Sequence, residues 1–153
     1  MRSNNLKLSD IQEASSELEL LPGAYNFLQK IRQNFQVVIL SDTFHEIAKP
    51  LMEKMGFPLL LCHNLDVVND EIISYKLRNK KAKKQAIESF QSIGYRCLAA
   101  GDSYNDLQMF EVADKSFFIN APDKISSSYP EIPSFDNYID LESAIEDNSI
   151  FKK

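Results

Sequence analysis

Hydrophobic and polar positions along this chain follow two patterns that alternate, one typical of helices and one typical of buried strands. Apolar residues at three- and four-residue spacing predict amphipathic helices over 6–20, 24–34 and 82–93. Continuous apolar runs, typical of strands buried on both faces of a sheet, predict strands over 35–40, 59–62, 97–100 and 116–120. The remaining periodic segments predict helices over 44–55, 106–113 and 141–147, and a short one after Pro122.

Two segments modify this alternation. Pro50 lies inside the 44–55 helix and implies a kink or a break there. The segment 65–75 predicts an exposed β-hairpin, with two short strands around an Asn69-Asp70 turn. Helices that alternate with buried strands predict a three-layer α/β/α fold, in which a mostly parallel sheet is the middle layer. At 153 residues, the chain fits a single domain, 1–153.

Composition and charge narrow the class of protein. A net charge of −5 argues against nucleic-acid and anionic-membrane partners, because both need a basic surface. No apolar run approaches the ~20 residues that span a bilayer, and the N-terminus lacks the apolar core of a secretory signal. Cys62 and Cys97 lie in apolar runs, which favours reduced packing residues over a disulfide or a zinc site. We therefore expect a cytoplasmic globular protein.

Polar clusters directly follow two of the predicted strands. Ser41-Asp42-Thr43 comes after the 35–40 strand, and Gly101-Asp102-Ser103-Tyr104-Asn105-Asp106 comes after the 97–100 strand. Ligands of parallel sheets bind beyond the carboxyl ends of the strands. Asp102 is placed to bind Mg²⁺, which needs only one or two protein carboxylates beside a substrate phosphate. Asp106, in the first turn of the next helix, can orient metal-bound water or a lysine, and Asn105 can contact a substrate.

Two further groups would complete a phosphate site, and each also has a plainer explanation. The Ser41 hydroxyl and the following N–H groups suit an anion cradle, but also an ordinary helix cap. The basic run over 78–84 suits a solvated face or a nucleic-acid patch, although a phosphate site also needs a cation, and Lys83 is the best placed. Likewise, Asp102 and Asp106 alone would fit a turn and a helix cap. A serine-esterase interpretation of Gly101-Asp102-Ser103 fails because no histidine follows His63.

These segments together resemble the haloacid dehalogenase superfamily. The motifs that carry the resemblance are Phe35-Gln36-Val37-Val38-Ile39-Leu40-Ser41-Asp42-Thr43-Phe44, Leu61-Cys62-His63 and Ala99-Ala100-Gly101-Asp102-Ser103-Tyr104-Asn105-Asp106. They are most similar to the bifunctional phosphoserine phosphatase/phosphoserine–homoserine phosphotransferase branch. The resemblance spans about 6–145 and implies a Rossmann-like core over 21–153, with 1–20 as a remnant of a helical cap. It also implies O-phosphoserine as substrate, Mg²⁺ as cofactor and a place in serine biosynthesis, and it leaves a homodimer open.

The resemblance also implies roles for individual residues. Lys83 and Asp106 match catalytic positions, Lys83 steadying the phosphoryl group, and Asp102 matches the Mg²⁺ ligand. The positions that match phosphate or substrate contacts are Ser41, Asp42, Lys83 and Asn105.

One feature of the family does not occur in these 153 residues. In the family, an Asp on the first strand attacks phosphorus and an Asp two residues later acts as acid and base, yet this sequence has no Asp-x-Asp. That strand is normally central, so we expect it before Leu6, which makes the domain N-terminally incomplete. We also expect an interruption of the sheet between the 35–40 and 97–100 strands. Since phosphate monoesters need up to ~10²¹-fold acceleration, the chain by itself is expected to be inactive. The alternative is a non-catalytic phosphate-binding or interaction protein derived from the family.

Overall fold

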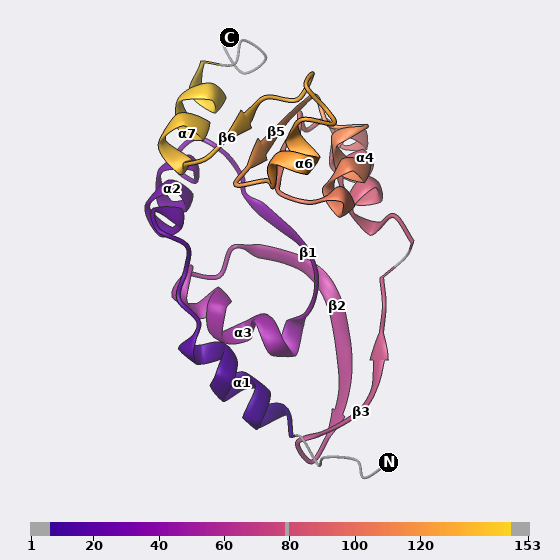
Figure 1. Cartoon of the computed structure of the whole chain (residues 1–153). Helices are drawn as coiled ribbons and strands as arrows, with labels where there is room; N and C mark the ends of the chain where they lie inside the picture. Colours follow the sequence, from indigo (N-terminus) through magenta and orange to yellow (C-terminus); the bar gives the residue numbers. More distant parts are fainter. Residues whose placement is uncertain (1–6, 79, 148–153) are drawn as a thin grey trace. The chain divides into compact units, whose positions relative to one another are not determined.

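The computed structural model describes residues 7–78 and 80–147 (Figure 1). The chain forms two compact units, Met1–Asn79 and Lys80–Lys153, which we call the first and the second unit. Each is described by itself below. The expectation of one domain over 1–153 stays a prediction.

The first unit combines three helices with a mixed three-stranded sheet. Its elements are α1 (Leu8–Glu17), α2 (Ala24–Ile31), β1 (Val38–Phe44), α3 (His45–Lys54), β2 (Leu59–Val68) and β3 (Glu71–Lys76). The strand order is β1-β2-β3, with β1 parallel to β2 and β3 antiparallel to β2. Ala48 and Met52 of α3 pack against Leu60 and Cys62 of β2, and these four side chains form a buried hydrophobic cluster.

The predicted hairpin is present, with its turn where the sequence places it. Asn69 and Asp70 both have positive φ, 50° and 69°, as the favoured two-residue hairpin turns require. The Asp70 carboxylate also accepts hydrogen bonds from the backbone N–H and the hydroxyl of Ser9, at the start of α1. One boundary differs from the prediction: the 59–62 strand and the first hairpin strand form a single continuous β2.

Pro50 lies within α3, which is one helix from His45 to Lys54. A proline inside a helix removes the N–H that would bond to the carbonyl four residues earlier, here that of Glu46. The Gln12 side-chain amide of α1 donates to this carbonyl instead, at 2.7 Å. A neighbouring helix therefore satisfies the acceptor that Pro50 leaves open, and the helix continues.

The second unit places helices around a parallel sheet. Its elements are α4 (Ala82–Ser92), β4 (Leu98–Gly101), the 3₁₀ turn η1 (Tyr104–Asp106), α5 (Leu107–Phe110), β5 (Lys115–Ile119), α6 (Asp123–Ser126), β6 (Ser134–Phe135) and α7 (Tyr138–Glu146). The strand order is β4-β5-β6, all parallel. Phe118 of β5 and Leu141 of α7 are fully buried at its centre. The sequence did not predict β6, because a strand of two residues carries no periodic pattern.

The described strands therefore form two three-stranded sheets. In the first sheet β1 is an edge strand that pairs only with β2, and in the second β4 is an edge strand that pairs only with β5. These are the two strands between which the sequence predicts an interruption. Among the described helices, none is both long and apolar enough to cross a bilayer.

The burial of Cys62 generates a first prediction. Burial, followed by the charge of Glu46, raises the pKa of the Cys62 thiol to about 11, so that about one thiol in a thousand is ionised at pH 8. Cys97 is less buried. In the variants Cys97→Ala and Cys62→Ala, each of which retains one thiol, we expect Cys62 to react with iodoacetamide far more slowly than Cys97. Urea should equalise the two rates. A native Cys62 that reacts as fast as Cys97 would contradict this packing.

Candidate active site

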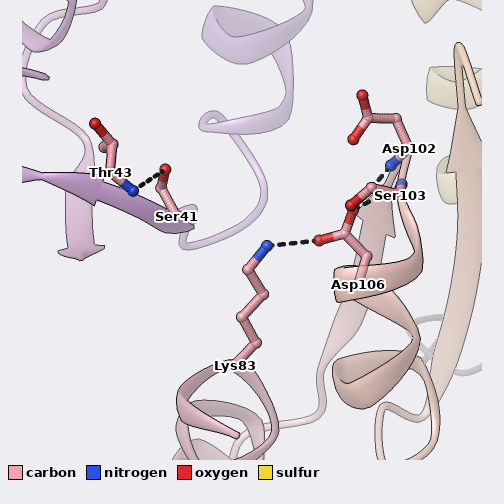
Figure 2. A network of polar contacts seen from close by, with 6 residues as sticks. All are labelled: Ser41, Thr43, Lys83, Asp102, Ser103 and Asp106. Carbon is pink, nitrogen blue, oxygen red and sulfur yellow. Dashed lines mark hydrogen bonds and ion pairs between the residues drawn. The ribbon is translucent and has the colours of Figure 1, made fainter. Parts of the chain in front are cut away.

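The turn after β4 is built around the carboxylate of Asp106. Its Oδ2 accepts hydrogen bonds from the backbone N–H groups of Asp102 and Ser103, both at 3.0 Å, and from the Ser103 hydroxyl at 2.9 Å. Its Oδ1 accepts from Lys83 Nζ at 2.8 Å (Figure 2). Four donors occupy the roughly four acceptor positions of a carboxylate. Asp106 is therefore a group that holds other groups in place.

The chain at Gly101 passes so close to this carboxylate that only glycine fits. A Cβ added there would lie 2.5 Å from Asp106 Oδ2 and 2.7 Å from its Cβ. Atoms at such distances must move apart, yet Asp106 is pinned by its four donors. The sequence singled out Gly101 as part of the motif but assigned it no role; the structure shows that its missing side chain makes room for Asp106.

Lys83 and Asp106 form a nearly buried ion pair. Lys83 is the second residue of α4, and the exposed fractions of the two side chains are 13% and 7%. Burial by itself raises the pKa of Asp106, but the hydrogen bond and charge of Lys83 and the bonds from Ser103 lower it more, so that it lies below its ordinary value. Asp106 thus stays ionised and fixes the ammonium group beside the Gly101–Asp106 turn. Of the two orienting roles the sequence offered for Asp106, this contact matches the one toward a lysine.

Asp102 and Asn105 lie on the outer side of the same turn. Both residues are exposed, and Figure 2 shows the Asp102 carboxylate directed away from Asp106. Asp102 thus offers the oxygen ligands that a hard cation prefers. The described residues hold no cluster of three or more His, Cys, Asp or Glu side chains that could bind a metal. The exposed Asp102 carboxylate remains the predicted metal ligand.

The other two predicted site residues, Ser41 and Asp42, belong to the first unit. The sequence placed them after a strand that ends at Leu40, but β1 continues to Phe44 with a register shift between Leu40 and Phe44. Three residues, Ser41, Asp42 and Thr43, thus oppose the single residue Cys62, an irregularity in the pairing that we call the bulge of β1. The Ser41 Oγ accepts a hydrogen bond from the Thr43 N–H at 3.2 Å, and Asp42 is exposed.

The plainer explanations hold for part of these groups. Ser103 and Asp106 do form a capping box around η1, as an ordinary turn would. In the basic run, Lys84 pairs with the exposed Glu111 at 3.1 Å and belongs to a solvated face. Lys83 differs from Lys84 because Lys83 and its partner Asp106 are both nearly buried. A helix cap alone does not require such a buried ion pair.

Gly101→Ala tests the close approach at the turn. Overpacking costs about 1–3 kcal/mol, and we expect this loss in the free energy of unfolding because the methyl group must displace Asp106. Gly94→Ala is the comparison: its methyl group meets nothing within 4 Å, so its cost of about 1–2 kcal/mol comes from the φ of 94° and not from a displaced side chain. Lys83 Nζ should change its NMR resonance in Gly101→Ala and keep it in Gly94→Ala. An unchanged resonance in both variants would refute the steric role of Gly101.

Lys83→Met tests the buried pair. Leaving a buried carboxylate without its cation costs about 3–5 kcal/mol. Lys84→Met, one residue along the same helix, is the matched control; Glu111 is 63% exposed there, so the loss should stay below about 1 kcal/mol. Urea denaturation measures both. Equal losses would mean that the buried pair contributes no more than a surface pair.

The same pair predicts a dependence on pH. Because the pKa of Asp106 is lower in the folded chain, its stabilisation is complete above the ordinary value of 3.8 and is lost as the pH falls through the lower folded value. The difference in unfolding free energy between wild type and Asp106→Asn should therefore shrink as the pH falls from about 5 through and below 3.8. A constant difference over that range would contradict the assigned ionisation.

Comparisons with known proteins agree with this architecture. Residues 3–114 match the family model of haloacid dehalogenase-like hydrolases. Phosphoserine phosphatase ThrH of Pseudomonas aeruginosa is 45% identical over 140 residues, which cover 91% of this chain and 68% of that protein. A phosphoserine phosphatase of Pseudomonas syringae pv. tomato is 46% identical over 140 residues, which cover 91% of this chain and 59% of that protein.

A solved structure extends the likeness to the fold. The crystal structure of a phosphoserine phosphatase in its apo form superposes with a TM-score of 0.75 at 18% identity, covering 93% of this chain and 74% of that one. At this identity the likeness concerns the fold alone. The α/β fold class and the superfamily resemblance seen in the sequence are thus confirmed. The chain belongs to the haloacid dehalogenase-like hydrolases.

Proposed function

We propose that this chain carries part of the active site of a phosphoserine phosphatase, which hydrolyses the phosphate monoester of O-phosphoserine in serine biosynthesis. The observation that carries the proposal is the buried Lys83–Asp106 pair beside the Gly101–Asp106 turn. Two relatives at 45% and 46% identity, both named phosphoserine phosphatases, support the substrate. The chain spans 68% and 59% of their lengths, so the activity is a proposal for the whole site and not for these residues alone.

Lys83 is proposed to neutralise the charge of the phosphoryl group. A fixed ammonium stabilises the negative charge that spreads over the phosphoryl oxygens in the transition state, and it needs no rearrangement during the reaction. Asp106 is proposed to hold that ammonium in position. Its own oxygens accept four hydrogen bonds, so it is better suited to positioning than to proton transfer.

Substrate contacts are assigned to three further residues. The Ser41 hydroxyl is proposed to bind the phosphate, with Asp42 beside it in the bulge of β1 contacting the substrate. Asn105, exposed on η1, is proposed as a further substrate contact. These roles rest on the match to the family motifs and on the exposure of Asp42 and Asn105.

Asp102 is the proposed ligand of Mg²⁺. Its exposed carboxylate follows β4 directly and suits a cation that keeps several waters beside one or two carboxylates. When bound, the ion would supply charge neutralisation at the phosphate oxygens. The peptide N–H of Asp102 donates to Asp106, which fixes the backbone that bears this ligand.

The nucleophile is proposed to lie outside the 153 residues, since they contain no Asp-x-Asp. In the proposed reaction, an aspartate oxygen attacks phosphorus, the bond to the serine oxygen breaks, and a second aspartate gives that oxygen its proton. Water then attacks the phosphorus of the aspartyl-phosphate and gives up a proton to the second aspartate, while the bond from phosphorus to the first aspartate's oxygen breaks, so that phosphate is released and the nucleophile is restored. Homoserine in place of water would make the protein a phosphotransferase. A cytoplasmic location completes the proposal.

A second candidate function is favoured by one observation. Without an Asp-x-Asp, the 153 residues retain the groups that bind a phosphate and lack those that cleave it. A non-catalytic phosphate-binding protein would need nothing more.

A complementation assay separates the two functions. The purified chain with Mg²⁺ and phosphoserine should release no phosphate above background. Adding a synthetic segment with an apolar strand and Asp-x-Asp should restore release, whereas the same segment with Asn-x-Asn should not. Lys83→Met should abolish the restored activity and Lys84→Met should leave it. Turnover by the chain alone would refute the proposal that the nucleophile lies outside these 153 residues. A folded mixture that stays inactive would favour the non-catalytic binding protein.

A further inference from the structure

The side chain of His63 lies among residues from all three strands of the first unit. His63 belongs to β2, where it pairs with Phe44 of β1, and its carbonyl oxygen accepts a hydrogen bond from the Cys62 thiol at 3.5 Å. Its imidazole contacts the Phe44 ring at a centroid distance of 5.7 Å, and Phe44 contacts the Tyr75 ring of β3 edge-on at 6.3 Å. The neighbouring strands therefore fix the position of the imidazole.

One hydrogen bond joins this imidazole to the chain beyond β3. The pairing between β2 and β3 ends at Asn64 and Lys76, and two residues later the Arg78 backbone N–H donates to His63 Nδ1 at 3.0 Å. This bond is part-buried, and Arg78 is the last described residue of the first unit. The His63 side chain thus holds the chain just past the end of the strand pairing.

The direction of this bond determines the protonation state of the ring. A backbone N–H can only donate, so His63 Nδ1 must offer its lone pair, and the single N–H of the neutral ring lies on Nε2. Protonation of the ring would place a second N–H on Nδ1, facing the N–H of Arg78 donor to donor. The hydrogen bond and the charged ring therefore exclude each other.

The elements packed against the ring carry charged and titratable groups of both signs. These groups are Asp42 of β1, His45, Glu46 and Lys49 of α3, Cys62 and Asp66 of β2, Tyr75 and Lys76 of β3, and Arg78 itself. The Glu46 carboxylate accepts from the Leu65 N–H at 2.9 Å, and Asp66 forms an ion pair with Lys76 at 2.7 Å. Neither carboxylate relies on the His63 ring as a partner, so protonation of the ring acts on the Arg78 N–H.

We propose that His63 is a pH-sensitive latch: its neutral ring holds the chain at Arg78, and protonation of the ring releases it. Histidine is the side chain that commonly changes its charge in mildly acidic solution. Arg78 precedes Lys83 by five residues, so the latch acts on the chain shortly before α4. The inference goes beyond the proposed function and does not depend on it, because the contact lies within the first unit.

The wild-type chain tests the latch directly, by ¹⁵N NMR between about pH 8 and pH 5. At pH 8 the His63 ring should show an unprotonated Nδ1 and a protonated Nε2. As the pH falls, the Arg78 amide resonance should move together with the ring signals of His63. An Arg78 amide that stays in place while His63 becomes protonated overturns the proposal, and so does a ring whose proton lies on Nδ1 at pH 8.

Two variants separate the latch from other effects of acid. In His63→Asn a side-chain oxygen takes the place of Nδ1 as acceptor and does not titrate, so the Arg78 amide should keep one position over the whole pH range. His45→Asn removes the exposed histidine of α3, the other histidine of the chain, and should leave the Arg78 titration as in the wild type. An Arg78 amide that still titrates in His63→Asn, or that no longer titrates in His45→Asn, overturns the latch.

Amide hydrogen exchange measures how much the latch holds. At pH 5 the Arg78 amide of the wild type should exchange roughly 5-fold faster than that of His63→Asn, as expected for the loss of one hydrogen bond. At pH 8 the two amides should exchange at similar rates, because both then have an acceptor. Since both chains are compared at the same pH, the intrinsic pH dependence of exchange cancels. Equal rates at pH 5 overturn the proposal.

Discussion

The site in the second unit depends on one buried ion pair. A carboxylate and an ammonium that are both nearly buried are costly to desolvate, and only mutual contact with further hydrogen bonds offsets that cost. Asp106 obtains these bonds from Lys83 and from the turn that carries Asp102 and Ser103. The pair therefore links α4 to the end of β4. Through the same contacts it holds the Lys83 ammonium group and the backbone of Asp102 in fixed positions relative to each other.

Satisfaction of buried polar groups explains other features of the chain as well. In the first unit, the Gln12 amide replaces the N–H that Pro50 lacks, and α3 keeps its full length. In the second unit, the absence of a side chain at Gly101 lets the Asp106 carboxylate approach the backbone. In both cases one residue makes room for, or compensates for, another: Gln12 compensates for Pro50, and Gly101 leaves space for Asp106. The arrangement of Gly101 and Asp106 lies at the proposed site of phosphoryl transfer.

Much of this fold was predictable, for physical reasons that also explain the exceptions. Apolar runs identified the core strands, and Asn69-Asp70 identified the hairpin, because burial and positive φ leave local signals. The extension of β1 through Ser41 and the two-residue β6 depend on pairing between distant segments, which periodicity does not encode. At the site, the motif indicated the residues around Asp102. The steric role of Gly101 emerges only from three-dimensional contacts.

Lys83 and Asp106 stabilise each other and do not merely lie close. A double-mutant cycle on the full chain, with Lys83→Met, Asp106→Asn and the combined variant, measures this coupling in the free energy of unfolding. We predict a coupling of about 2 kcal/mol or more, near the upper end for residues in one buried network. Losses that add to within about 0.3 kcal/mol would contradict it, because the two side chains would then act independently.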